Sequence, residues 1–323
     1  MSSHSNREEG DGAYERKQEH TSVLVPEVVA LLAPKDGDVV LDATVGSGGH
    51  SEALLEAARI TLVALDADPE AVAHVSHRLM PFGRRAQVIE ANFADAEEAL
   101  QKAGVTRIDR ALFDLGWRRE QLSQGKGFSF LADEPLNMSY GTMPRSGFTA
   151  TDILNRFSET ALADVFFGYG GERYARRIAR AVVEARGKAP VETTAQFIDV
   201  VGGAVPGGYR RGRTHFATKV FQALRIAVND ELRALEQGIR GAWNLLAPGG
   251  RMAVITFHST EDRAVKNLFK VLALEGLPAA PGSAAQAGGT LLVKKPLTAG
   301  IQERAENPSA RSAKLRGIEK NLS

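Results

Sequence analysis

Glycines and an acidic residue follow two apolar segments near the start of the chain, a combination suited to nucleotide binding. The apolar segment 39–42 leads into the glycine-rich sequence Thr44-Val-Gly-Ser-Gly-Gly-His50, and a helical pattern follows over 51–58. Glycines allow a tight turn and let a ligand approach the backbone. The next apolar segment ends at Asp66, eighteen residues after Gly48. A carboxylate so placed can accept hydrogen bonds from the ribose hydroxyls of an adenosine-containing cofactor; the alternative is a surface aspartate in a loop.

Several other chemistries do not fit these residues. A nicotinamide-binding fingerprint has a third glycine where this chain has Ser51. No Gly-Lys-Ser/Thr sequence follows the glycine turn, which argues against ATP hydrolysis. His50 and His258 are far apart in the sequence, so no metal site is predicted. Because the chain has no cysteine, disulfides, thiolate ligands and cysteine nucleophiles are excluded.

The composition is that of an ordinary soluble globular protein. The chain has 323 residues, of which 43% are hydrophobic and 24% charged, and its net charge is +1. This length favours two domains, or one large domain with an insertion. No apolar segment is long enough for a membrane span. The first nineteen residues are polar and lack the apolar core of a secretory signal, so we expect a disordered tail and a cytoplasmic protein.

Strands are expected to alternate with helices in the part of the chain that lies before residue 141 and after residue 215. Apolar segments rich in β-branched residues predict the strands, and the segments between them have helical periodicity. This alternation predicts an α/β fold with a parallel, doubly wound sheet. The expected strands cover 39–42, 61–66, 87–93, 107–115, 251–257 and 290–295, and the expected helices of this part cover 27–32, 51–58, 94–103, 216–246 and 261–272.

The alternation stops in the middle of the chain, where no strand is evident. Helical patterns cover 149–157, 158–167, 172–186 and 193–204. They predict a helical insertion into the sheet domain. We therefore expect a tail at 1–19, a discontinuous sheet domain at 20–140 and 216–323, and an inserted helical substrate-recognition domain at 141–215. The segment 307–316 is expected to be a basic tail.

Positive charge is concentrated in this helical part. Between residues 170 and 225 there are eleven Lys or Arg and four Asp or Glu. Four arginines of the pattern 172–186 fall on one stripe of the helix, and more follow in a glycine-rich connector. Such a distribution favours a nucleic-acid-binding surface, and the alternative is a solvated helix face. The candidate residues are Arg173, Arg176, Arg177 and Arg180 on the stripe, and Arg210, Arg211 and Arg213 in the connector.

Several sequence blocks together resemble the bacterial MraW/RsmH family, over about residues 20–318. These blocks are His20-Thr-Ser-Val-Leu, Val45-Gly-Ser-Gly-Gly-His50, Gly127-Phe-Ser-Phe, Gly171-Glu-Arg-Tyr-Ala-Arg-Arg-Ile-Ala-Arg180, Phe221-Gln-Ala-Leu-Arg-Ile-Ala-Val-Asn-Asp-Glu231, Phe257-His-Ser-Thr-Glu-Asp-Arg263 and Glu306-Asn-Pro-Ser-Ala-Arg-Ser312. The resemblance implies a Rossmann-like class I methyltransferase sheet with an inserted helical domain. It also implies transfer of a methyl group from S-adenosylmethionine to N4 of a cytidine in small-subunit ribosomal RNA, near the decoding centre.

The same resemblance implies roles for individual residues, and the small ribosomal subunit or its RNA as partner. The protein could also form a homodimer. We expect no membrane partner. The implied cofactor-binding residues are Gly48, Gly49 and His50 at the methionine end, Asp66 at the ribose, Phe93 at the adenine, Asp114 near the reacting centre and Gln121 beside the cofactor.

Two loops depart from the pattern of the family. Trp117-Arg118-Arg119 stands where the family usually has Val-Ser-Ser, and Leu136-Asn-Met-Ser139 where it has Leu-Asp-Met-Arg. Asp114 and Trp117 have the spacing of the acidic-x-x-aromatic motif of amino-group methyltransferases. We therefore expect Asp114 to accept a hydrogen bond from the amine and Trp117 to stack on the base, unless Trp117 belongs to the core. A methyltransferase with another substrate and a non-catalytic RNA-binding paralogue remain alternatives.

Overall fold

A computed structural model describes residues 21–115, 125–129, 132–141, 143–274 and 288–322. The expected tail at 1–19 lies outside these residues, as do Trp117 and Gln121. None of the described helices is long and apolar enough to span a lipid bilayer.

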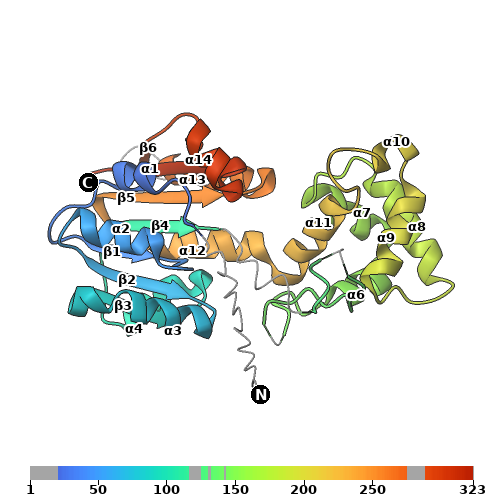
Figure 1. Cartoon of the computed structure of the whole chain (residues 1–323), viewed down its shortest axis with the longest axis horizontal. Helices are drawn as coiled ribbons and strands as arrows, with labels where there is room; N and C mark the ends of the chain where they lie inside the picture. Colours follow the sequence, from blue (N-terminus) through green and yellow to red (C-terminus); the bar gives the residue numbers. More distant parts are fainter. Residues whose placement is uncertain (1–20, 116–124, 130–131, 142, 275–287, 323) are drawn as a thin grey trace, which may run out of the picture.

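A seven-stranded sheet with the order β3-β2-β1-β4-β5-β7-β6 forms one of the two parts of the molecule (Figure 1). The first five strands in this order are parallel, and β7 is antiparallel to both β5 and β6. The predicted α/β class is thus confirmed. The strands are β1 (Val39–Asp42), β2 (Thr61–Asp66), β3 (Ala86–Glu90), β4 (Ile108–Asp114), β5 (Leu246–Thr256), β6 (Gly289–Leu291) and β7 (Lys314–Lys320).

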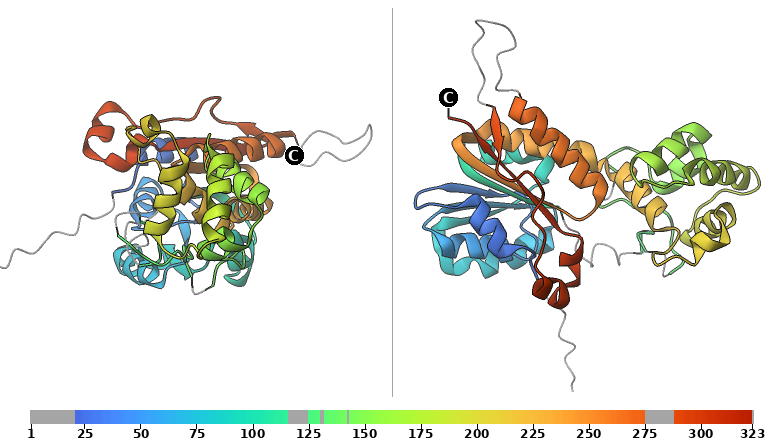
Figure 2. Two further views of the ribbon diagram at one scale, coloured as in Figure 1. Left: turned by 90° about the vertical axis from the view of Figure 1, so that its right-hand side faces the viewer. Right: turned by 90° about the horizontal axis from the view of Figure 1, so that it is seen from above.

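Helices cover both faces of this sheet (Figure 2). Successive strand residues point to opposite faces, and in β1 the buried Val40 and Leu41 accordingly belong to two different hydrophobic clusters. The Val40 cluster contains α1 (Val25–Leu32), α2 (Gly49–Ala57) and α3 (Pro69–Arg78). The Leu41 cluster contains α4 (Ala96–Lys102), α12 (Glu231–Leu245) and α13 (Ser259–Leu274).

The end of the chain differs from expectation. The basic tail expected at 307–316 overlaps β7, and the last strand expected at 290–295 is the short β6. The charged side chains of β7 obscured the strand pattern, although they are paired in the fold. Arg316 donates to Asp262 Oδ1 at 2.7 Å and to Oδ2 at 3.2 Å, and Arg251 on β5 donates to Glu319 at 2.7 Å. These ion pairs allow an arginine to be buried in the sheet.

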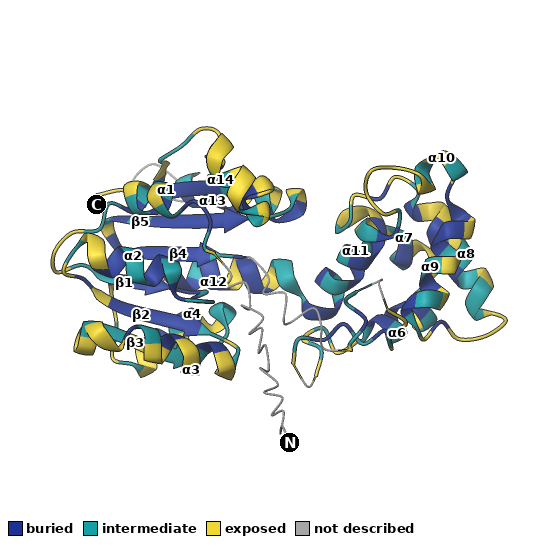
Figure 3. Ribbon diagram, in the orientation of Figure 1, coloured by how far each residue is buried: buried dark blue, intermediate teal, exposed yellow. Residues whose placement is uncertain are grey.

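The predicted helical patterns form a separate packed unit (Figures 1 and 3). Thr149 and Thr193 each close a capping box at a helix start, as the sequences Thr-x-x-Asp and Thr-x-x-Gln indicate. The hydrophobic core of the unit extends from Leu136 to Val228 and so reaches beyond 141–215 on both sides. The helices are α6 (Ala150–Arg156), α7 (Glu159–Gly168), α8 (Ala175–Arg186), α9 (Thr194–Ala204), α10 (Gly207–Arg210) and α11 (Thr218–Asn229).

The prediction of a single helix over 216–246 is wrong. The chain forms α11 and α12, and Asp230 between them has φ 49° and ψ 41°. Aspartate tolerates this left-handed conformation better than most residues, so one residue can turn the chain. As a result α11 packs in the helical unit whereas α12 packs on the sheet (Figure 1).

Candidate functional site

A pocket lies at the carboxyl ends of the parallel strands, where open α/β sheets bind ligands. On the sheet side it is lined by Thr44 and Gly46 after β1, Asp66 at the end of β2, Asn92 and Phe93 after β3, and Asp114 at the end of β4. On the opposite side it is lined by Tyr140, Arg145, Asn229, Glu231 and Glu261. The structure therefore brings the predicted Asp66, Phe93 and Asp114 to one cavity.

Backbone hydrogen bonds orient the carboxylate of Asp66. Gly46 N donates to its Oδ2 at 3.0 Å, and Asp68 N donates to its Oδ1 at 2.9 Å. Gly46 has φ 54° and Gly48 has φ 87°, a region that favours glycine. The glycine turn and the acidic residue are thus one unit, and Gly46 lines the pocket itself.

Gly48 and Gly49, the two glycines predicted to bind the cofactor, allow close packing behind the turn. A Cβ on Gly48 would lie 3.2 Å from Val75 Cγ1, and one on Gly49 would collide with the side chain of Ser22. Their contact with a cofactor stays a prediction.

His50 lies behind Asp114 and is only 5% exposed. Its Nε2 lies 2.8 Å from the carbonyl oxygen of Val23, and its Nδ1 lies 3.6 Å from Asp114 Oδ2. The sequence did not indicate this pairing, because His50 and Asp114 lie on different elements. Direct contact between His50 and a cofactor stays a prediction.

Asp114 belongs to a buried polar group at the ends of β1 and β4. Its backbone N–H donates to Thr44 Oγ1 at 2.6 Å. Nearby, Asp42 accepts from Ser51 Oγ at 2.7 Å and from Thr44 N at 3.2 Å. Burial raises the pKa of Asp42, while His50 and these hydrogen bonds oppose the shift. The group therefore holds Asp114 in a defined position at the pocket.

Phe93 gives the pocket an apolar wall. Its ring meets that of Phe113 edge to face, with centroids 6.3 Å apart and planes at 87°. Gly238 on α12 allows this approach, since a Cβ there would lie 2.6 Å from Phe93 O. An aromatic wall beyond Asp66 is suited to a purine.

The wall opposite the sheet was not predicted. Tyr140 donates from its hydroxyl to Glu231 Oε1 at 2.6 Å, and its ring stacks on Phe128 with centroids 5.3 Å apart. Arg225 donates to both oxygens of Glu231, at 2.9 and 3.1 Å. Burial, with Glu231 as the next cause, raises the pKa of Tyr140 well above its usual value. The sequence blocks at 136–139 and 221–231 are separate in the chain, and only the fold brings Tyr140 and Glu231 together.

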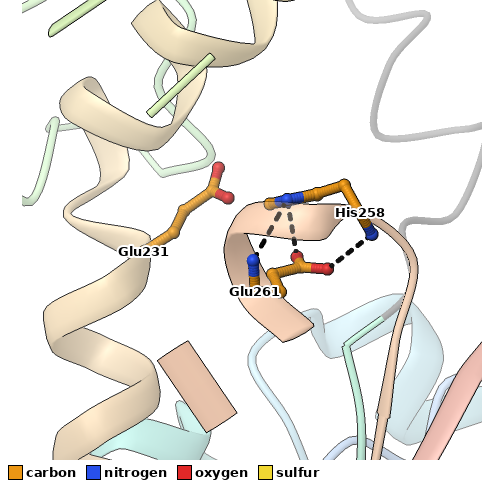
Figure 4. Close-up of side chains that lie close together, drawn as sticks. All are labelled: Glu231, His258 and Glu261. Atoms are coloured by element: carbon orange, nitrogen blue, oxygen red, sulfur yellow. Dashed lines mark hydrogen bonds and ion pairs between the residues drawn. The ribbon is translucent and has the colours of Figure 1, made fainter. Parts of the chain in front are cut away.

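Glu231, His258 and Glu261 are close enough to be considered as a metal site (Figure 4). Their candidate ligand atoms lie within 4.8 Å of one another. However, Glu231 already binds the guanidinium of Arg225, and His258 Nε2 lies 2.9 Å from Glu261 Oε1. Glu261 N donates to His258 Nδ1 at 3.3 Å, at the start of α13. Arg225 therefore supplies positive charge where a cation would bind.

The predicted RNA-binding arginines are exposed on the helical unit. The guanidinium of Arg173 lies 4.8 Å from the ring centres of both Tyr174 and Tyr209, and Arg180 lies 3.6 Å from Glu159. α8 and α10, which carry most of these arginines, lie farther from the sheet than α11 (Figure 1). The arginines are Arg173, Arg176, Arg177, Arg180, Arg210, Arg211 and Arg213, and their contact with RNA stays a prediction.

Comparison with known proteins identifies the family of this chain. A curated protein of Syntrophotalea carbinolica, "Ribosomal RNA small subunit methyltransferase H", is 46% identical over 93% of this chain and 97% of its own. Proteins of the same name from Geobacter sp. (strain M21) and Magnetococcus marinus are each 44% identical, over 93% and 94% of this chain and 98% of their own. A solved rRNA methylase from Streptococcus thermophilus is 12% identical, with a TM-score of 0.41, over 92% of this chain and 94% of its own. The description of the MraW methylase family matches residues 17–321, and the chain belongs to this family.

Proposed function

We propose that this methyltransferase transfers a methyl group from S-adenosylmethionine to N4 of a cytidine in small-subunit ribosomal RNA, near the decoding centre. The observation that carries the proposal is the presence of Asp66, Phe93 and Asp114 in one pocket at the carboxyl ends of β2, β3 and β4. Relatives that match nearly the whole chain are named small-subunit ribosomal RNA methyltransferases. The N4 position follows from the sequence resemblance.

The pocket residues fit an adenosine-containing methyl donor. Asp66 is held with its carboxylate in the pocket wall and can accept from ribose hydroxyls, Phe93 can contact the adenine, and Gly46 leaves space beside the backbone. The bound donor supplies a methyl group on a sulfonium, which is already activated for transfer. No additional activating metal is required for that chemistry.

The residues of the enzyme must then solve the problem of a weak nucleophile. The lone pair of the cytosine amine is delocalised into the ring, so nitrogen, methyl carbon and sulfur must be held in line. Asp114 is placed to accept a hydrogen bond from the amine as it loses planarity, and then to take its proton. The base must leave its stack to reach this pocket. Trp117, outside the described residues, is proposed to stack on it.

We propose that the inserted helical domain holds the RNA substrate. Arg173, Arg176 and Arg180, with the basic connector, bind RNA phosphates on the inserted helical domain. The substrate is the small ribosomal subunit or its RNA in the cytoplasm. Light scattering of the purified protein would test the proposed homodimer.

Transfer of a radioactive methyl group tests the function in vitro. Small subunits from a strain lacking this gene, free small-subunit RNA and transfer RNA would each be incubated with the enzyme and labelled donor. We expect label in ribosomal RNA, recovered as N4-methylcytidine, and a loss of at least about a hundredfold with Asp114→Asn. Label recovered only in transfer RNA, or in another nucleoside, would overturn the proposal.

A further inference from the structure

The hydrogen bond between His50 and Val23 fixes which nitrogen of the imidazole carries the proton. The carbonyl oxygen of Val23, 2.8 Å from Nε2, can only accept, so Nε2 carries the hydrogen. In a neutral imidazole Nδ1 is then a bare acceptor. This acceptor lies 3.6 Å from Asp114 Oδ2. His50 therefore presents a base to the side of Asp114, at a distance that can shorten when a substrate binds.

Two carboxylates flank the ring of His50. Asp42 on β1 interacts with it electrostatically and is 1% exposed, and Asp114 Oδ2 on β4 lies 3.6 Å from its Nδ1. On its own helix, Ser51 bonds to Asp42, and Glu52 is paired with Arg78 at 3.1 Å. An imidazolium at His50 would thus lie beside two carboxylates in a buried site, where electrostatic attraction is strong.

We propose that His50 is the final acceptor of the amine proton and acts through Asp114, an inference that rests on the proposed function. As the new C–N bond forms, the S–C bond breaks and its electron pair stays on sulfur, which leaves a neutral thioether. The positively charged nitrogen gives its proton to the Asp114 carboxylate. The protonated Asp114 then donates to His50 Nδ1, which restores the carboxylate and creates an imidazolium. His50 acts on the amine only through Asp114 and is a positioning residue for it.

This role has a defined dependence on pH. His50 can accept only while its ring is neutral, so turnover of the parent enzyme should rise with pH until His50 is neutral and then level off. A variant without the acceptor nitrogen should lack this rise. A purely structural role of His50 would not change the shape of the profile.

The decisive variant is His50→Gln, with His74→Gln as the matched control. The glutamine amide can still donate to Val23 O but provides no base. His74 is an exposed histidine on α3. We expect His50→Gln to lower kcat about a hundredfold and to remove the acidic limb of the kcat profile, with both measured at saturating S-adenosylmethionine so that a change in its Kd is separated from the proton transfer. The control should behave as the parent does. A parental kcat and pH profile in His50→Gln, or a loss that follows weakened cofactor binding alone, would overturn the proposal.

A measurement on the unaltered protein gives an independent test if His50→Gln does not fold. Nitrogen-15 NMR of the imidazole at pH 8 distinguishes the two neutral tautomers without any substrate. We expect the Nε2–H form at His50. The Nδ1–H form would overturn the proposal even if RNA is methylated, whereas an Nε2–H form in a protein that methylates no RNA would refute the proposed function alone.

Discussion

The hydroxyl of Tyr140 donates to Glu231 at 2.6 Å, across 91 residues of sequence. Tyr140 follows the loop at 132–139, and Glu231 begins α12, directly after the break at Asp230. Arg225 on α11 binds the same carboxylate. One hydrogen-bonded group therefore joins the loop, the helical unit and the sheet domain at the pocket, and the shape of the pocket depends on it.

Tyr140→Phe should weaken both stability and turnover. Loss of the hydroxyl removes a hydrogen bond to a charged, largely buried group, a change of about 1.5–3 kcal/mol in the free energy of unfolding. It also removes the contact that holds Tyr140 against Glu231 in the pocket wall, so kcat/KM should fall. Tyr209→Phe is the matched control, because Tyr209 donates to Glu172 at the same 2.6 Å but within the helical unit. Denaturant unfolding and methyl-transfer kinetics measure the two effects. Equal activity of both variants would show that the Tyr140 bond has no role in the reaction.

The raised pKa of Tyr209 should make the folded protein less stable at alkaline pH. Burial, with the hydrogen bond to Glu172 next, raises the pKa of Tyr209 from 10.0 to about 12. The folded state therefore retains this proton at pH values where the unfolded chain loses it. Its contribution to stability is complete below pH 10 and disappears as pH rises towards 12. Unfolding at pH 9 to 11.5 should show a steeper decline for the parent than for Tyr209→Phe, and parallel declines would contradict the assignment.

Asp66→Ala should weaken binding of the methyl donor. It removes a charged acceptor from the proposed ribose contact, about 1.5–3 kcal/mol, or roughly a ten- to hundredfold increase in Kd. Asp68→Ala is the control, because Asp68 caps α3 by accepting from Glu70 N. The Asp68→Ala protein should melt at a lower temperature than the parent but bind the methyl donor with the same affinity. Calorimetric titration decides the matter: an unchanged Kd in folded Asp66→Ala would refute the ribose contact.

Reversal of charge on the arginine stripe at 173–180 should weaken RNA binding without changing the affinity for the methyl donor. Arg173, Arg176 and Arg180 would be changed together to Glu. Each lost phosphate contact should reduce the slope of log affinity against log salt by roughly 0.7–0.9. The control changes three exposed arginines that precede strands of the sheet, at the edge opposite the pocket: Arg59, Arg84 and Arg107. Filter binding at several salt concentrations measures both proteins, and equal slopes would mean that the stripe is only a solvated face.

The cofactor side of the pocket could be predicted because its signals are local. A strand, a glycine turn and an acid at the end of the next strand are consecutive in sequence, and parallel pairing of β1 with β2 brings them together. Their hydrogen bond from Gly46 to Asp66 follows from this arrangement.

The opposite wall could not be predicted in the same way. The contact of Tyr140 with Glu231 depends on the left-handed Asp230, which interrupts an otherwise continuous helical pattern. The strand β7 was missed for a related reason. Its arginine is compatible with burial only because Asp262, 54 residues earlier, pairs with it.

Mapping of modified nucleosides in small-subunit ribosomal RNA shows whether this protein methylates N4 of a cytidine in the cell. The RNA would come from a strain that lacks this gene, and from the same strain carrying the parent gene or Asp114→Asn. We expect one cytidine near the decoding centre to lose its N4-methyl group in the deletion strain, to regain it with the parent gene and not to regain it with Asp114→Asn. Full N4 methylation of that cytidine in the deletion strain would show that this protein is not the enzyme responsible, and its restoration by Asp114→Asn would refute the role of the Asp114 carboxylate.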